Sequence, residues 1–585
     1  MLLNLPLSLL SSCFLWLAAV QADYHWPSLP YDAYEEFFVR RLSAGRVEFG
    51  TARYSVQVAR RDKYHGRCGV GSTCSKVYHD VATHNITDGT GGLDGSIFFE
   101  IDRVENVGAG MNNTINDFST YPSKYLTRAD IIAIATVFAV ATCSGPVIPF
   151  RGGRVDANIA GPYGVPNASD PIDSLTSNFA HQGFNTSEMI QLVACGHTLG
   201  GVRYPDFPDV VSGSGSTTIV DLFDETQQFD HNIVSQYLDG STRDPLLVLN
   251  QTMASDLRVF SSDGNVTMQS MNSADSFAQA CATVFDKMLN TVPSDVTLTD
   301  EITLVPFKVS AVQLTVGTSQ LQFQASVRLE ATQSTTVKMY WCDRYGSAAN
   351  CSGNVQRFAA SGGSQAVSSP VTTAMGITLE KYSFVVPVNA SQSISKFWFV
   401  VDYGNGTTVT ADNGGTDYVI DQDEVLWVPS MSTDKSVLDS SVGIFIAAAV
   451  KSSGSTPSRV YIDCFGRATS DFLPVNATYD LTLNTSIPAV AGYDFYTGTA
   501  TASFGATMQF DLYAVDANGT SYVDEYRQSG LIGVALVAAS SVNSTTSGTV
   551  PGGVSGAESV SLRNWSSRWG VGMLGVSLLW TLRYI

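Results

Sequence analysis

The chain of 585 residues is too long for one ordinary domain, and we expect about two to four. Its composition, 44% apolar and 15% charged, is that of a folded protein. The net charge of −20 and the pI near 4.6 argue against nucleic acid as a partner, because its phosphates would be repelled. An acidic surface of this kind is more simply explained as an aid to solubility.

Both ends of the chain have the features of targeting signals. Residues 1–22 combine an apolar core with small residues at the end, which predicts a secretory signal peptide cleaved after Ala22. At the other end, a Gly/Ser/Thr-rich spacer (536–568) precedes a short apolar segment (569–585), a pattern typical of a GPI-type lipid-anchor signal. We therefore expect a secreted, extracellular protein attached to a membrane or cell wall through its C-terminus.

The cysteines and the glycosylation sequons agree with secretion. Eight cysteines remain once Cys13 leaves with the signal peptide, which predicts disulfide bonds whose pairing the sequence leaves open. Cys342 and Cys351 flank a Gly/Ser/Asn loop and could form one of them. Asn-x-Ser/Thr sites recur as candidate glycan acceptors, for example at Asn85, Asn112, Asn185, Asn250, Asn389, Asn405, Asn476 and Asn518.

Helix signals fill the chain up to about residue 298. Residues 127–130 are typical of a capping box before an apolar run that ends near Cys143. Residues 185–188 form a second such box, and the apolar face that follows leads to His197. Residues 273–289 predict a further amphipathic helix.

From about residue 303, Ser, Thr, Val and aromatic residues alternate between Gly/Asn turns, which predicts antiparallel β-sandwiches. We expect two all-β, sandwich-like modules, at 301–430 and 431–535. Exposed Trp341, Trp398 and Trp427 could stack on sugars, but core positions are the simpler expectation.

Two of the seven histidines lie in patterns that suggest chemistry. His79 precedes an oxygen-only set, made of the Asp80 and Asp94 carboxylates, the Gly92 carbonyl and the Ser96 hydroxyl, that suits calcium. His197 ends an apolar helix within residues 194–201. Taken singly, each pattern has an ordinary explanation, as a hydrogen-bonded core histidine or a glycine-rich turn.

The order of these patterns resembles the plant–fungal–bacterial haem peroxidase superfamily, and more narrowly the secreted fungal peroxidases with an extra C-terminal domain. The resemblance covers residues 30–300 and implies a mostly α-helical peroxidase domain at 23–300, one haem b and one or two calcium ions. The matching segments are His79-Asp80, 91–96, Glu100, Asn106, 143–154, 194–201 and Ser255-Asp256.

The resemblance also implies roles for single residues. His197 matches the proximal ligand of the haem iron, and Asp256 the carboxylate that accepts a hydrogen bond from it. His79 matches the distal acid–base group, and Asn106, supported by Glu100, the amide that orients it.

Two calcium sites are implied as well. Asp80, Gly92, Asp94 and Ser96 match the distal ligands. On the proximal side the corresponding ligands are Thr198, Asp224, Thr226 and Asp230. The spacing from Asp224 to Asp230 is one residue shorter than in the family pattern. Cys68 and Cys143 fall where the family has a disulfide.

One departure concerns the distal arginine, which the family places four residues before the distal histidine. Here that position is Ser75, and Lys76 or Arg67 are the candidates to replace the arginine. Such a charge stabilises the departing hydroxide, and losing a preorganised donor costs on the order of 10²-fold in rate. Tyr78 stands where Phe or Trp is expected.

Other departures exclude subtypes. Arg203 occupies the position of an acidic residue in manganese-oxidising relatives, and residues 30–300 contain no tryptophan for long-range electron transfer.

These observations predict a secreted haem peroxidase that reduces H₂O₂ and oxidises small phenolic donors. The alternative is a catalytically weakened haem-binding protein of the cell surface, suggested by Ser75. In a third hypothesis the β modules determine the function by binding a glycan or a protein partner.

Overall fold

The computed structural model describes residues 24–39, 42–43, 46–47, 77–108, 111, 115, 118, 121–213, 219–224, 226, 228–434, 443–452, 456–467, 474–501, 508–529 and 543–546. The predicted signal peptide (1–22) and the apolar C-terminal segment (569–585) lie outside these residues, whereas residues 543–546 of the predicted spacer form a strand. Within them, no helix is long and apolar enough to cross a membrane.

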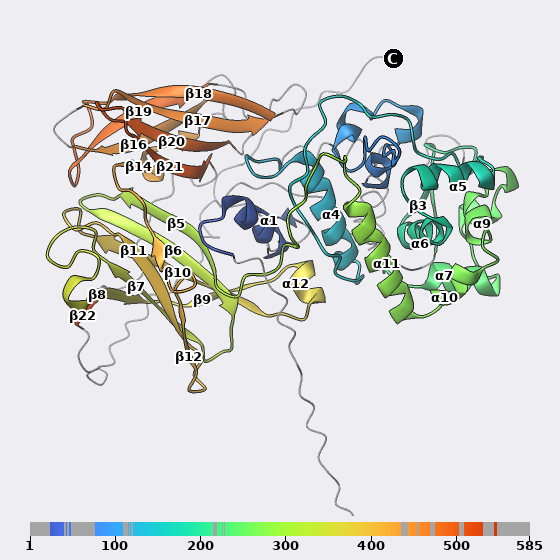
Figure 1. Ribbon diagram of the computed structural model, residues 1–585, viewed down its shortest axis with the longest axis horizontal. Coiled ribbons are helices and arrows are strands. Elements are labelled where there is room, and N and C mark those ends of the chain that lie inside the picture. Colours follow the sequence, from blue (N-terminus) through green and yellow to red (C-terminus); the bar gives the residue numbers. More distant parts are fainter. Residues whose placement is uncertain are drawn as a thin grey trace, which may run out of the picture. The chain divides into compact units, whose positions relative to one another are not determined.

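The first part of the chain is mainly helical, as predicted, and the later part is built from β-sheets (Figure 1). The α-helices of the first part are α1 (Leu29–Val39), α4 (Arg128–Thr142), α5 (Ile172–His181), α6 (Thr186–His197), α7 (Asn232–Asp239), α8 (Pro245–Val248), α9 (Ser255–Phe260), α10 (Val266–Ser270) and α11 (Ala274–Leu289). The short elements are the 3₁₀ turns η2 (Ser96–Phe99), η3 (Val104–Asn106) and η4 (Gln251–Met253) and the two-stranded ribbons β1 (Leu42–Ser43) with β2 (Arg46–Val47) and β3 (Gly201–Tyr204) with β4 (Ile219–Leu222).

Local capping fixes where the longest helices begin. The Thr127 side chain accepts from the Asp130 backbone N–H at the start of α4, and Ser273 caps α11 in the same way. Asn185 and Glu188 form the complete predicted capping box at the start of α6. At α4 the predicted reciprocal bond is absent, because the Asp130 carboxylate binds Arg154 instead.

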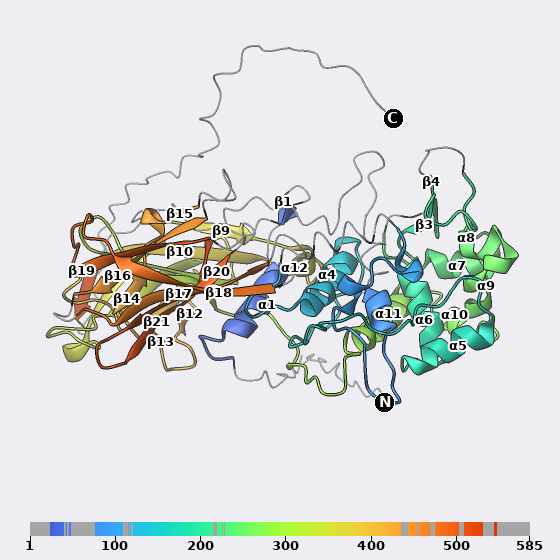
Figure 2. The same cartoon turned by 90° about the horizontal axis from the view of Figure 1, so that it is seen from above.

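Helices α6 and α11 lie side by side in both views (Figures 1 and 2). A disulfide between Cys195 and Cys281 joins them, across 86 residues of sequence. Their buried faces belong to one hydrophobic core that also includes α4 and α1. This core holds His197, the last residue of α6, in a fixed position.

The first β module packs two antiparallel sheets over a common core. The strands alternate buried and more exposed residues, as in β10, which is what a two-sheet sandwich requires. One sheet has the order β5 (Lys308–Val316), β6 (Leu321–Glu330), β10 (Leu379–Val388), β9 (Ser364–Val367). The other has the order β12 (Thr408–Ala411), β11 (Lys396–Asp402), β7 (Thr336–Cys342), β8 (Val355–Ala360), β22 (Asn543–Thr546), with β13 (Tyr418–Val419) beside β11. The connections contain η5 (Ser352–Asn354), α12 (Pro370–Ala374) and η6 (Pro429–Met431).

The second β module is one eight-stranded antiparallel sheet that folds over its own core. Its order is β14 (Val425–Trp427), β16 (Ile444–Lys451), β19 (Tyr493–Ala500), β18 (Pro474–Leu483), β17 (Arg459–Arg467), β20 (Gln509–Val515), β21 (Ser521–Gln528), with β15 (Thr433–Asp434) beside β16. The fold brings the two end strands together, since the Trp427 backbone N–H donates to Asp524 at 2.8 Å.

Two details of the β region bear on its predicted roles. Trp341 and Trp427 are fully buried core residues, and Trp398 stacks on Tyr340 with ring centres 5.8 Å apart. The Cys342–Cys351 disulfide forms as predicted. Neither buried tryptophan presents its ring face to a sugar.

Candidate functional site

A hydrogen bond to Asn106 orients the imidazole of His79. His79 lies in the helical stretch 77–81, and its Nδ1 is 2.7 Å from Asn106 Oδ1. Asn106 is buried in η3, and its Nδ2 donates to the Glu100 backbone carbonyl at 2.9 Å. Because the amide nitrogen is used there, the amide oxygen faces His79 and Nδ1 must carry the proton. Nε2 is then the basic nitrogen of the neutral ring.

Glu100 stabilises the segment that carries Asn106. It is 1% exposed, and its Oε1 accepts from the Gly161 backbone N–H at 2.6 Å. Arg103 lies 3.5 Å from the other carboxylate oxygen. The predicted support of Asn106 by Glu100 is therefore present, through the backbone carbonyl of Glu100.

His197 is held by Asp256 on the opposite side of its ring from Nε2. Nδ1 lies 2.5 Å from Asp256 Oδ2, and the other Asp256 oxygen accepts from Ser255 Oγ at 3.1 Å. Phe223 stacks on the imidazole with ring centres 4.1 Å apart. Within the described part of the chain, Nε2 of His197 makes no hydrogen bond, so this nitrogen is available to bind a metal.

Asp244 extends this arrangement, and no local sequence motif identifies it. Asp244 is fully buried, and burial together with the Asp256 charge raises its pKa well above its usual value. Its Oδ1 caps α8 by accepting from Leu246, whereas Oδ2 has no donor among the described residues. A protonated Asp244 can donate to Asp256 and so stabilise its charge.

The predicted distal calcium ligands come together as an oxygen-lined turn. Burial and the neighbouring Asp94 carboxylate raise the pKa of Asp80, and burial raises that of Asp94. Ser96 Oγ lies 3.4 Å from Asp80, and the Gly92 carbonyl accepts from the Asp94 backbone N–H at 2.8 Å. Buried carboxylates of this kind favour protonation unless a cation accompanies them, so the donor set fits calcium.

The predicted proximal set also converges. Thr198 Oγ1 donates to the Asp230 backbone carbonyl at 2.6 Å and lies 3.5 Å from the Asp224 carboxylate. The Asp224 carboxylate accepts from the backbone N–H and the hydroxyl of Thr226, at 2.7 and 2.9 Å. Burial raises the pKa of Asp224 to about 6. In the residues that the structure describes, no group of three or more His, Cys, Asp or Glu is placed to hold a metal. Each set supplies only two carboxylates, and hydroxyl and carbonyl oxygens complete it.

Several predicted features fall outside the described residues: Ser75, Lys76, Arg67 and Cys68. Cys143 is disulfide-bonded, and the predicted pairing with Cys68 stays a prediction because Cys68 lies outside the described residues. Tyr78 is described: its ring stacks on Phe179 at 5.4 Å, and its buried hydroxyl has a raised pKa.

The family comparison agrees with this geometry. A family model described as peroxidase matches residues 54–280, which include His79, Asn106, His197 and Asp256. This region is a peroxidase domain. The match agrees with the resemblance to the plant–fungal–bacterial peroxidase superfamily that the sequence motifs indicated, and haem is the cofactor of that superfamily. The available Nε2 of His197 fits the iron of such a group.

Similar proteins include peroxidases and one with a different name. A "WSC domain-containing protein" of Arthroderma benhamiae is 33% identical over 57% of this chain and 47% of its own length. A putative L-ascorbate peroxidase 6 of Arabidopsis thaliana is 32% identical over 22% of this chain and 40% of its own length. Manganese peroxidase 3 of Phlebia radiata is 31% identical over 28% of this chain and 48% of its own length. The chain thus spans about half the length of these relatives, or somewhat less.

The peroxidase domain contains site features that sequence reasoning missed. Asp244, the Phe223 ring and the Cys195–Cys281 disulfide carry no local motif. An even number of cysteines in a secreted chain predicted disulfides, yet it could not identify this pair.

Proposed function

We propose that the chain is a haem peroxidase that reduces H₂O₂ and oxidises small phenolic donors in one-electron steps. The observation that carries this proposal is the pair of oriented histidines, His79 on Asn106 and His197 on Asp256, within one peroxidase domain. Haem, when bound, supplies the iron and the redox chemistry.

The chain's own residues then handle protons and position the ligand. His79 Nε2 accepts a proton from one oxygen of H₂O₂ and delivers it to the other, which leaves as water. Asn106 keeps Nε2 unprotonated by fixing the proton on Nδ1. Asp256 accepts a hydrogen bond from Nδ1–H of His197 and so makes Nε2 of that ring a more basic ligand.

The test is phenol oxidation by the haem-loaded chain. His79→Leu should lower kcat/KM for H₂O₂ by about 10²- to 10⁴-fold with haem content unchanged, because a general acid–base group is lost. His181→Leu, at an exposed helix end, is the matched control and should keep the wild-type rate. Equal activity of both variants would rule out the proposed role of His79.

The second candidate is a catalytically weakened haem-binding protein, which Ser75 favours. Installing the family's arginine decides between the two. If Ser75→Arg accelerates the reaction with H₂O₂ by about 10²-fold, the wild-type chain is the weakened form. If the wild-type rate is already high and the variant gains nothing, this candidate fails.

Calcium, secretion and anchoring complete the proposal. The two oxygen-lined sets would each hold one calcium ion, which would hold the segments next to His79 and His197 in place. The signal peptide (1–22), the sequons and the anchor signal (569–585) would place the protein outside the cell, attached to its surface or wall.

A further inference from the structure

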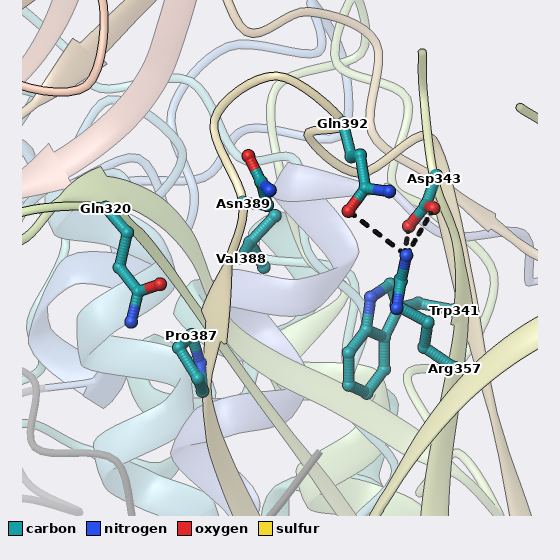
Figure 3. A pocket seen from close by; sticks show the side chains of 8 residues that line it. All are labelled: Gln320, Trp341, Asp343, Arg357, Pro387, Val388, Asn389 and Gln392. Atoms are coloured by element: carbon teal, nitrogen blue, oxygen red, sulfur yellow. Dashed lines mark hydrogen bonds and ion pairs between the residues drawn. The ribbon is translucent and has the colours of Figure 1, made fainter. Parts of the chain in front are cut away.

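A cavity of about 280 Å³ opens at one end of the first β module, far in sequence from the peroxidase site. Its walls come from both sheets and from the turn after β10 (Figure 3). The lining residues are Gln320, Trp341, Asp343, Arg357, Pro387, Val388, Asn389 and Gln392.

Carboxamides provide most of the polar lining. Gln320 and Asn389 are exposed, and within the described residues the Gln320 carboxamide and the Asn389 amide nitrogen make no hydrogen bonds. Gln392 uses its oxygen to accept from Arg357 at 3.1 Å, which leaves its amide nitrogen as a donor. Figure 3 shows these three side chains on different sides of the cavity.

The only charges among the lining residues neutralise each other. Arg357 binds Asp343 through two bonds, Nε to Oδ1 at 2.7 Å and Nη2 to Oδ2 at 2.9 Å. This bidentate pair fixes the orientation of the guanidinium and raises the pKa of Arg357. An anion therefore meets no uncompensated positive charge here, and a cation meets no uncompensated carboxylate, because Asp343 is paired with Arg357.

The cavity is built on constrained backbone. The Cys342–Cys351 disulfide closes the loop that carries Asp343. The Gln392 carbonyl accepts from the backbone N–H groups of Arg344 and Tyr345, both at 2.8 Å, and so ties the turn to that loop. A site fixed in this way loses little conformational entropy when a ligand binds.

The ligand must therefore be uncharged, rich in hydroxyl groups and partly apolar. Amides and a paired guanidinium offer donors and acceptors to hydroxyls, while half-buried Pro387, with buried Val388 and Trp341 behind the wall, offers apolar contact to C–H groups. The volume of about 280 Å³ lies just below the roughly 300–1,000 Å³ of sites for drug-sized ligands, which suits a smaller ligand such as a single sugar ring. We infer that this cavity is a binding subsite for a neutral hexose unit.

Two sources could supply that sugar: a free saccharide, or the protein's own glycan on Asn389, whose sequon residue Ser391 donates to Asn389 Oδ1 at 2.9 Å. Ser391→Ala removes the sequon and leaves the cavity lining intact. Binding of free glucose by both the wild-type and the Ser391→Ala chains identifies a free saccharide as the ligand. Binding by Ser391→Ala alone identifies the glycan on Asn389 as the occupant.

The experiment is saturation-transfer NMR on the full-length chain with glucose and glucuronate as probes. In the Ser391→Ala background, Gln320→Leu should weaken glucose binding about fivefold or more, because a carboxamide partner is lost. Gln365→Leu, an exposed residue of β9, is the matched control and should change nothing. No saturation transfer to glucose in Ser391→Ala, or equal binding by the two glutamine variants, would overturn the inference, as would binding of glucuronate that is about tenfold tighter than that of glucose.

Discussion

At the scale of single residues, a hydrogen bond at Nδ1 of each imidazole sets the chemistry of the site. Asn106 Oδ1 accepts from Nδ1–H of His79, and Asp256 Oδ2 accepts from Nδ1–H of His197, so each ring presents Nε2. Both pairs could be predicted from the sequence, because the family motifs that carry them are short and ordered. Asp244 could not, since its effect arises only where the fold buries it beside Asp256.

Asp244 makes a prediction about pH. Its pKa is raised in the folded state, so the folded chain holds this proton more tightly than the unfolded chain does. The resulting contribution to stability is fully present below the unfolded pKa and is lost as the pH rises through the folded pKa. Asp244→Asn cannot ionise and should therefore lose less stability than wild type as the pH rises above the unfolded pKa of about 4. Urea unfolding at several pH values measures this.

The exposed Asp275→Asn is the control for that experiment and should follow the wild-type pH dependence. Identical pH profiles for wild type and Asp244→Asn would show that Asp244 is not held protonated beside Asp256.

At the scale of elements, caps and tight turns place the site segments. The start of α6 was predicted from its capping box, because capping depends on residues three apart. The glycine turn before η2 depends on close approach: Gly92 has φ +110, and a Cβ there would lie 2.7 Å from the Thr291 carbonyl. The turn could be predicted from its glycines, whereas its contact with Thr291, some 200 residues later in the chain, is visible only in the folded structure.

Calcium removal tests the turn and the proximal set together. Chelation should lower the Tm of the full-length chain, and calcium at about 100 times its Kd should restore about 2.7 kcal/mol of stability per site. Magnesium should restore less, because it demands near-octahedral geometry. In Asp94→Asn the calcium-dependent gain should fall to that of one site, and a Tm insensitive to chelation would contradict both sites.

At the scale of the whole molecule, α1 connects the peroxidase domain to the first β module. Tyr34 donates to Asp130 at 2.9 Å on one side. On the other side, buried Glu35 accepts two hydrogen bonds from Arg328, one from Nη1 at 3.0 Å and one from Nη2. Sequence reasoning assigned α1 to the first domain only, because the sequence of a short helix does not indicate a contact with a residue some 290 positions away.

Glu35→Gln should therefore destabilise both parts of the molecule. It leaves Arg328 buried without its charge partner, which costs about 3–5 kcal/mol. Urea transitions followed by tryptophan fluorescence and by haem absorbance should both move to lower urea. Glu330→Gln, at the exposed end of β6, should move neither. A shift confined to one signal would contradict the connecting role of α1.

The central claim is that the His79 and His197 pairs form a working haem peroxidase site. Stopped-flow absorbance of the haem-loaded chain mixed with H₂O₂ tests it most directly. The account predicts a fast loss of Soret intensity whose rate rises in proportion to peroxide concentration. A haem-loaded chain whose Soret band does not respond to peroxide would contradict it.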